Sequence, residues 1–82
     1  MLMAGGSSTQ VHHLKMDGPS GSDEWGSAEF EIDGQPPPPG TDCILTVPEP
    51  RRHYKVEILA VAPSRTFNRV RLATRVKLVP HP

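Results

Sequence analysis

Four basic side chains near the end of the sequence form its most distinctive chemical pattern. Arg69, Arg71, Arg75 and Lys77 are all separated by even numbers of residues. Alternate residues of a β-strand point to the same face, so this spacing places the four bases on one face, about 7 Å apart where they are two residues apart. Such a face could bind the phosphates of a nucleic acid or an acidic protein surface.

Three carboxylates show the same alternation earlier in the chain. Glu29, Glu31 and Asp33 alternate with Ala28, Phe30 and Ile32, which predicts a half-buried strand with one acidic face. A catalytic pair of carboxylates needs a cleft and two different environments, and an exposed strand face offers neither. We therefore interpret this acidic face as solvated, or as paired with the basic face across the sheet, where each pair would contribute about 0.2–1 kcal/mol.

The other reactive side chains do not predict a catalytic, cofactor-binding or metal site. Cys43 belongs to a short apolar run, where a thiol is typically a small buried hydrophobe. The four histidines have no cysteine or histidine partners at zinc-site spacing, and neither a phosphate-binding glycine loop nor a hydrolase triad is recognisable. We expect a protein that is not an enzyme and that holds no cofactor and no metal.

The elements that carry these residues are predicted to be β-strands. Alternating or continuous apolar runs cover residues 27–33, 43–47, 53–62 and 67–79, and no stretch has helical spacing. The last two strands should form a hairpin across residues 63–66. The sequence thus predicts an all-β, single-domain fold: a small barrel or curved antiparallel sheet of about four to five strands, of SH3-like or OB-like size.

The chain is expected to divide into an arm and a domain. Residues 1–26 are mostly small, polar or turn-forming and predict a flexible or extended N-terminal arm. Residues 27–80 should form the β domain, with a proline-rich loop at residues 35–40. The expected core is apolar and comes from all four strands: Phe30, Ile32, Ile44, Leu45, Val47, Tyr54, Val56, Ile58, Val70, Leu72, Val76 and Leu78.

Charge is divided between the two parts of the sequence. Residues 1–50 carry one base and eight acids, and residues 51–82 carry eight bases and one acid. Such a division suggests that the two halves neutralise each other, within one chain or between chains. No apolar run approaches the ~20 residues of a membrane span, and the first residues do not resemble a secretory signal. We expect a cytoplasmic or virion setting and no membrane partner.

These features together favour a structural or interaction protein. A subunit of a larger assembly, comparable in design to phage capsid-decorating, head–tail joining or tail proteins, would explain the arm, the thin core and the divided charge. Its partner would be another protein or another copy of itself. The alternative is a small nucleic-acid-binding or regulatory barrel that uses the basic face, although Tyr54 and Phe67 are expected in the core and so would not stack on bases. A small enzyme inhibitor is a third possibility.

Overall fold

The computed structural model describes residues 1–19, 21, 23–38, 40–48 and 51–79. Within these residues the protein is all-β, without a helix, and its strands form one antiparallel sheet in the order β2-β1-β5-β6-β7-β4-β3. Pro39 of the expected proline-rich loop and Pro80, the expected end of the domain, lie outside the described residues. The strands are β1 (Leu2–Ala4), β2 (Ser7–Thr9), β3 (Val11–Asp17), β4 (Trp25–Asp33), β5 (Cys43–Val47), β6 (Arg52–Pro63) and β7 (Arg69–Leu78).

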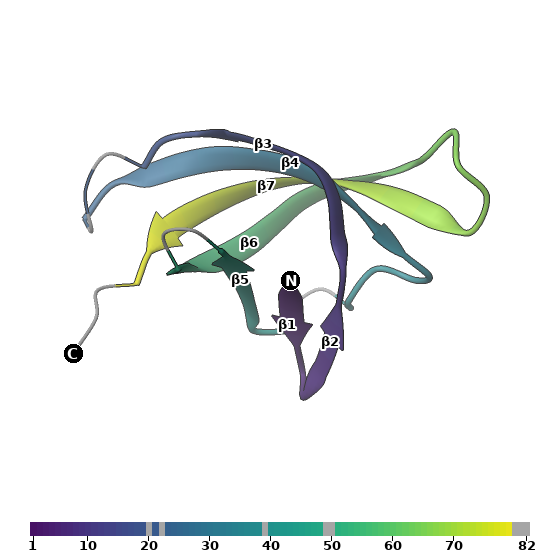
Figure 1. The fold of residues 1–82 in the computed structure, drawn as a ribbon, viewed down its shortest axis with the longest axis horizontal. Helices are drawn as coiled ribbons and strands as arrows, with labels where there is room; N and C mark the ends of the chain where they lie inside the picture. The colour runs from purple at the N-terminus through teal and green to yellow at the C-terminus, as the bar shows by residue number, and fades with distance from the viewer. Residues whose placement is uncertain (20, 22, 39, 49–50, 80–82) are drawn as a thin grey trace.

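The sheet is curled into a half-barrel. Its two edge strands, β2 and β3, are consecutive in the chain and are separated only by Gln10. They run as one curved path that leaves β1 and crosses over to β4 (Figure 1). A β-bulge between His12 and Lys15, with His13 at a φ of 55°, bends this path, because an extra residue increases the local bend and twist of a strand.

Alternation correctly predicted the two strands that carry the charged faces. β4 and β7 pair without interruption from Trp25↔Lys77 to Asp33↔Arg69. β7 also pairs with β6 on its other side, which confirms the expected hairpin. Side chains of alternate residues therefore enter the concave face of the curled sheet, and the charged ones remain on its convex face.

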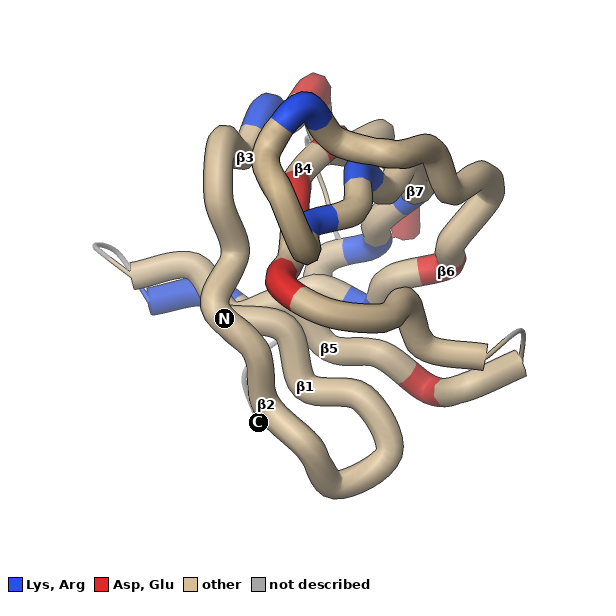
Figure 2. Tube along the Cα trace, turned by 90° about the vertical axis from the view of Figure 1, so that its right-hand side faces the viewer, with Lys and Arg blue, Asp and Glu red and all other residues tan. Residues whose placement is uncertain are grey.

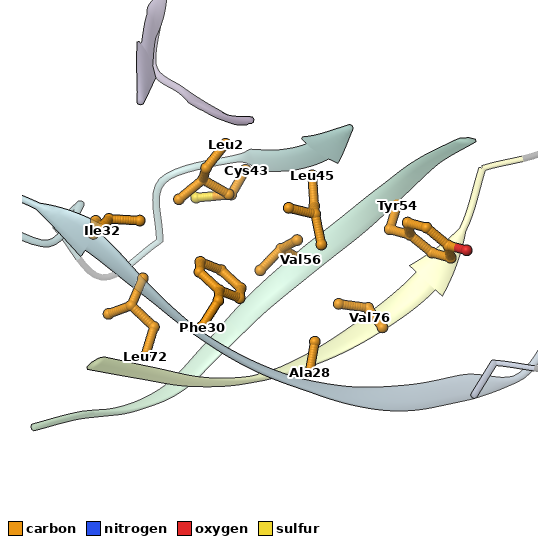
Figure 3. Close-up of a cluster of buried hydrophobic side chains, with 10 residues drawn as sticks. All are labelled: Leu2, Ala28, Phe30, Ile32, Cys43, Leu45, Tyr54, Val56, Leu72 and Val76. Carbon is orange, nitrogen blue, oxygen red and sulfur yellow. The ribbon is translucent and has the colours of Figure 1, made fainter. Parts of the chain in front are cut away.

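The core fills the concave face. Figure 3 shows buried side chains from five strands pointing into the same space, with Phe30 near its centre. The expected core residues are buried or partly buried there, with two exceptions. Ile44 faces away, because its neighbours Cys43 and Leu45 take the inward positions of β5. The expectation that Phe67 lies in the core is wrong, because Phe67 is 95% exposed. The buried cluster comprises Leu2, Ala28, Phe30, Ile32, Cys43, Leu45, Tyr54, Val56, Leu72 and Val76.

The extended arm expected over residues 1–26 is not found. β1 and β2 form a hairpin around Gly5 and Gly6, whose φ angles of 56° and 88° suit the two-residue turn that glycine favours. β1 also pairs with β5, and the N-terminal amino group donates a hydrogen bond to the Thr46 carbonyl at 2.9 Å. Leu2 is only 2% exposed. Its burial offsets the entropic cost of ordering a short polar segment.

The strand number is also corrected. The described residues form seven strands rather than the four to five expected. The additional strands, β1, β2 and β3, all come from the segment that was expected to be an arm. β3 is the possible fifth strand that the sequence allowed over residues 11–16, whereas β1 and β2 have three residues each and were not identified by periodicity.

Replacing Leu2 with Ala tests the integration of the N-terminus. We expect the free energy of unfolding to fall by about 2–5 kcal/mol, because the substitution leaves a cavity in the core. Met3 lies on the opposite face of β1 and is 45% exposed, so Met3→Ala serves as the matched control and should change stability by less than about 1 kcal/mol. Urea denaturation of both variants measures this. Equal stabilities would mean that the N-terminus behaves as a free arm.

Candidate functional site

The acidic and basic faces lie beside each other on the convex surface. The register of β4 and β7 sets Glu31 opposite Arg71 and Asp33 opposite Arg69. Figure 2 shows acidic and basic positions interleaved along these strands. The structure thus brings together the two sets of residues that the sequence singled out.

Each arginine of the basic face has a carboxylate partner within the chain. Arg69 Nε lies 3.1 Å from Asp33 Oδ1, and Arg71 lies 3.6 Å from Glu29 and 3.9 Å from Glu31. Arg75 contacts Glu57 of β6 through two hydrogen bonds of 2.9 and 2.7 Å. The charge of these arginines is therefore largely matched on the protein's own surface.

Trp25 covers the remaining end of the basic face. The Arg75 guanidinium lies 4.2 Å from the centre of the indole ring, and the Lys77 ammonium lies 5.6 Å from it. Both distances are typical of cation–π contacts. Sequence reasoning had assigned no role to Trp25, which pairs with Lys77 in the ladder of β4 and β7.

Glu31 is the most enclosed carboxylate of the acidic face, with 8% of its surface exposed. Ser64, in the turn after β6, donates a hydrogen bond to it and accepts one from the Thr66 amide. The Ser64 hydroxyl, and secondarily His13, Arg71 and Arg69, lower the pKa of Glu31 despite its partial burial. Glu31 therefore ties the β6–β7 turn to the convex face.

Asp33 sits at the end of the same face, between the His12 ring and the Arg69 guanidinium. Its carboxylate contacts His12 at 3.0 Å and Arg69 at 3.1 Å. Hydrogen bonds from His12 and then Arg69 lower the pKa of Asp33. Ion pairs and hydrogen bonds thus hold Glu31 and Asp33 in the charged form, and neither is poised to donate a proton near neutral pH.

The surroundings of Cys43 disfavour its reactive thiolate form. The Cys43 thiol is buried, and desolvation, with a smaller effect of Asp42, raises its pKa, which favours the less nucleophilic thiol form. Among the described residues, no three side chains of the His, Cys, Asp or Glu type gather as a metal site would require. The described part of the chain also contains no helix of the length and hydropathy that crossing a membrane requires.

A second surface, which the sequence did not predict, lies on the outer half of the β6–β7 hairpin. β5 pairs with β6 only as far as Val56, whereas β6 continues to Pro63. This half of the hairpin extends beyond β5 (Figure 1), while β4 accompanies it on the β7 side as far as Arg69. Leu59, Val61 and Phe67 are 61%, 48% and 95% exposed. We call these three side chains the hairpin patch.

The exposure of the hairpin patch has two local causes. The partners of β5 on β6 end at Val56, so no described strand lies beside Leu59 and Val61 on that side, even though a bulge between Ile58 and Ala60 aligns Val61 with the inward-facing Leu72 of β7. Phe67, expected at the start of the last strand, lies instead in the turn before Arg69. The turn-forming Pro63-Ser64 and Asn68, which has a φ of 59°, are the sequence signals that could have revealed the longer turn.

The outer half of β6 also borders a groove. Its volume is about 600 Å³, and its other wall is the loop between β4 and β5, including Pro36, Pro37 and Pro38. Leu59 and Val61 line the β6 side. Exposed apolar side chains beside a groove are typical of a surface that binds another polypeptide.

Comparison with known proteins assigns no family. No family model, no curated protein and no solved structure matches this chain.

The lowered pKa values of Glu31 and Asp33 predict an acid-sensitive fold. Each carboxyl binds protons less readily when folded than when unfolded, so its stabilising contribution is present above the unfolded pKa and is lost as the pH falls through the folded pKa. Unfolding free energy should therefore decline on acidification below about pH 4.5, the ordinary pKa of a glutamate. Urea midpoints measured across this range test the expectation.

Two variants assign the acid sensitivity to this cluster. Glu31→Gln removes the titrating group, so the unfolding free energy should decline less steeply on acidification than in the parent. Ser64→Ala removes the hydroxyl donor and should raise the pKa of Glu31, which also makes this decline less steep. If the unfolding free energy of both variants declined with acidification as steeply as that of the parent, Glu31 would not be a source of the acid sensitivity.

Proposed function

We propose that the protein is a non-enzymatic interaction protein, a small β subunit of a larger assembly, which binds protein through the hairpin patch. The observation that supports this most is the exposure of Phe67, together with Leu59 and Val61, on the half of the hairpin that extends beyond β5. Apolar side chains that gather on one exposed element are typical of protein-binding surfaces, and buried aromatic residues contribute strongly to such interfaces.

The intramolecular ion pairs also support an apolar rather than an electrostatic contact. Arg69, Arg71 and Arg75 would have to leave carboxylate partners within 4 Å to bind an acidic surface of another molecule. The same requirement weighs against the alternative, a phosphate-binding basic face for nucleic acid, because binding depends on bases that release counterions from phosphates. Within one chain, Glu29, Glu31 and Asp33 of the acidic half pair with Arg69 and Arg71 of the basic half.

Replacing Phe67 with Ser tests the proposed function. Sedimentation velocity of the purified chain, up to roughly 0.5 mM, should show association of the parent and its loss in Phe67→Ser. Because the contact is apolar, association should persist when the salt concentration rises from about 0.1 to 1 M. Val79→Ser is the matched control, because Val79 is an exposed apolar residue away from the hairpin.

Three results would contradict the proposal. One is a parent chain that stays monomeric over the whole range. Another is association that Phe67→Ser leaves intact. The third is association that salt abolishes and that Arg71→Glu disrupts, which would instead indicate an electrostatic interface between the acidic and basic faces.

A further inference from the structure

The outer half of β6 is an unpaired sheet edge. β7 pairs with β6 from Tyr54 to Pro63, but β5 covers only Arg52 to Val56. Among the described residues, no strand pairs with residues 57–63 on the side away from β7. The hairpin patch therefore lies beside free backbone hydrogen-bonding groups.

The direction of these groups follows from the ladder with β7. The Ser64 amide donates to the Arg69 carbonyl at 3.3 Å. Backbone groups of successive residues in an antiparallel strand point alternately to its two sides, so Ala62 also faces β7, while Val61 and Pro63 face away. Pro63 has no N–H to leave unsatisfied there, and Val61 presents one N–H and one C=O to the open side.

Two common guards against pairing with another strand are missing from the centre of this segment. Natural edge strands are usually guarded by charged side chains, a proline, a bulge, short length or a covering loop. Here the bulge and Pro63 lie on either side of Ala60, Val61 and Ala62, which themselves carry neither a charge nor a proline. Residues 58–64 contain no charged side chain, and the neighbouring loop leaves the groove open. An exposed apolar edge of this kind is typically covered by a partner strand in the functional assembly.

The sequence of the edge is complementary to itself. Glu57 stands at one end, Arg65 at the other, and the residues between them are uncharged. An antiparallel arrangement of two such segments about Val61 brings Arg65 of each copy to the same end as Glu57 of the other. Arg65 is exposed and makes no ion pair with a described residue. Glu57 is half-exposed, so its carboxylate can accept a second cation besides Arg75.

We propose that the partner of this edge is a second copy of the chain, which pairs with it antiparallel across a two-fold axis at Val61. The sheets of the two copies then continue into each other through β6, and Leu59 and Val61 of both copies become buried. Phe67 of each copy packs against the other copy just beyond Glu57, at the end of the paired segment. This inference rests on the proposed function and names the partner of the hairpin patch. A strand pair of this length buries less than a standard interface of about 1,600 Å², so the dimer is expected to be concentration-dependent.

Cysteine cross-linking of the full chain distinguishes this geometry from other contacts. Directly opposed residues of an antiparallel pair have Cα atoms about 5 Å apart, within reach of a disulfide. Val61→Cys should therefore form a covalent dimer on mild oxidation. Phe67→Cys should not, because the two copies of residue 67 lie at opposite ends of the paired segment. The buried Cys43 can remain, and the parent chain is the control for its reactivity.

Charge exchange tests the same arrangement without cysteines. Arg65→Glu alone places two acids at each end of the pair, and Glu57→Lys alone places two bases there. Each variant should associate about tenfold more weakly than the parent. An equimolar mixture of the two restores both attractive contacts and should recover the affinity of the parent. Arg51→Glu makes the same charge change as Arg65→Glu but lies outside the edge, so its affinity should remain that of the parent.

The outcomes separate this inference from the proposed function. Covalent dimers of Val61→Cys and recovery in the mixture support pairing of the two edges. Covalent dimers of Phe67→Cys instead of Val61→Cys would overturn the pairing, and so would a mixture of Arg65→Glu and Glu57→Lys that associates no more tightly than either variant alone. Both results would still be compatible with an apolar contact through the hairpin patch. A parent chain that is monomeric at roughly 0.5 mM overturns both.

Discussion

The pairing of β7 with both of its neighbours is the constraint on which the structure depends. β7 is bonded along its length to β4 on one side and to β6 on the other. Side chains alternate along a strand, so a slip of one residue would exchange the two faces. The register that places Leu72, Thr74 and Val76 in the core therefore also places Arg69, Arg71 and Arg75 beside their carboxylates. Core packing and surface charge pairing are two consequences of one alignment.

The same alignment leaves the outer hairpin without cover. β7 is paired along this half with β4, as far as the Asp33↔Arg69 pair, and with β6, as far as Pro63. The pairing of β5 with β6, in contrast, ends at Val56. A chain of 82 residues has a small core, and the ten buried apolar residues are all grouped in the concave face of the half-barrel. Leu59, Val61 and Phe67 lie beyond that face, which is why burying them requires another molecule.

The sequence predicted best the elements whose apolar and charged residues alternate without interruption. The inward faces of β4 and β7 and the side-by-side placement of Glu31 and Arg71 follow from their period of two. The N-terminal hairpin was missed because β1 and β2 have three residues each, too few to show a period, although Gly5-Gly6 is a recognised hairpin signal. The hairpin patch was missed because β5 stops at Val56 of β6 and because Phe67 lies in the turn rather than in β7. No local residue type marks where a neighbouring strand ends.

Amide hydrogen exchange at Val61 tests most directly whether the unpaired edge of β6, rather than the charged faces of β4 and β7, binds a partner. In a dilute sample the Val61 N–H should exchange fast, because it points away from β7, while the adjacent Ala62 N–H should exchange slowly. NMR at a high protein concentration should then show the Val61 amide slowing by about tenfold or more, with Ala62 protected in both samples. A Val61 amide that exchanges equally fast at a concentration at which the chain associates would contradict the account.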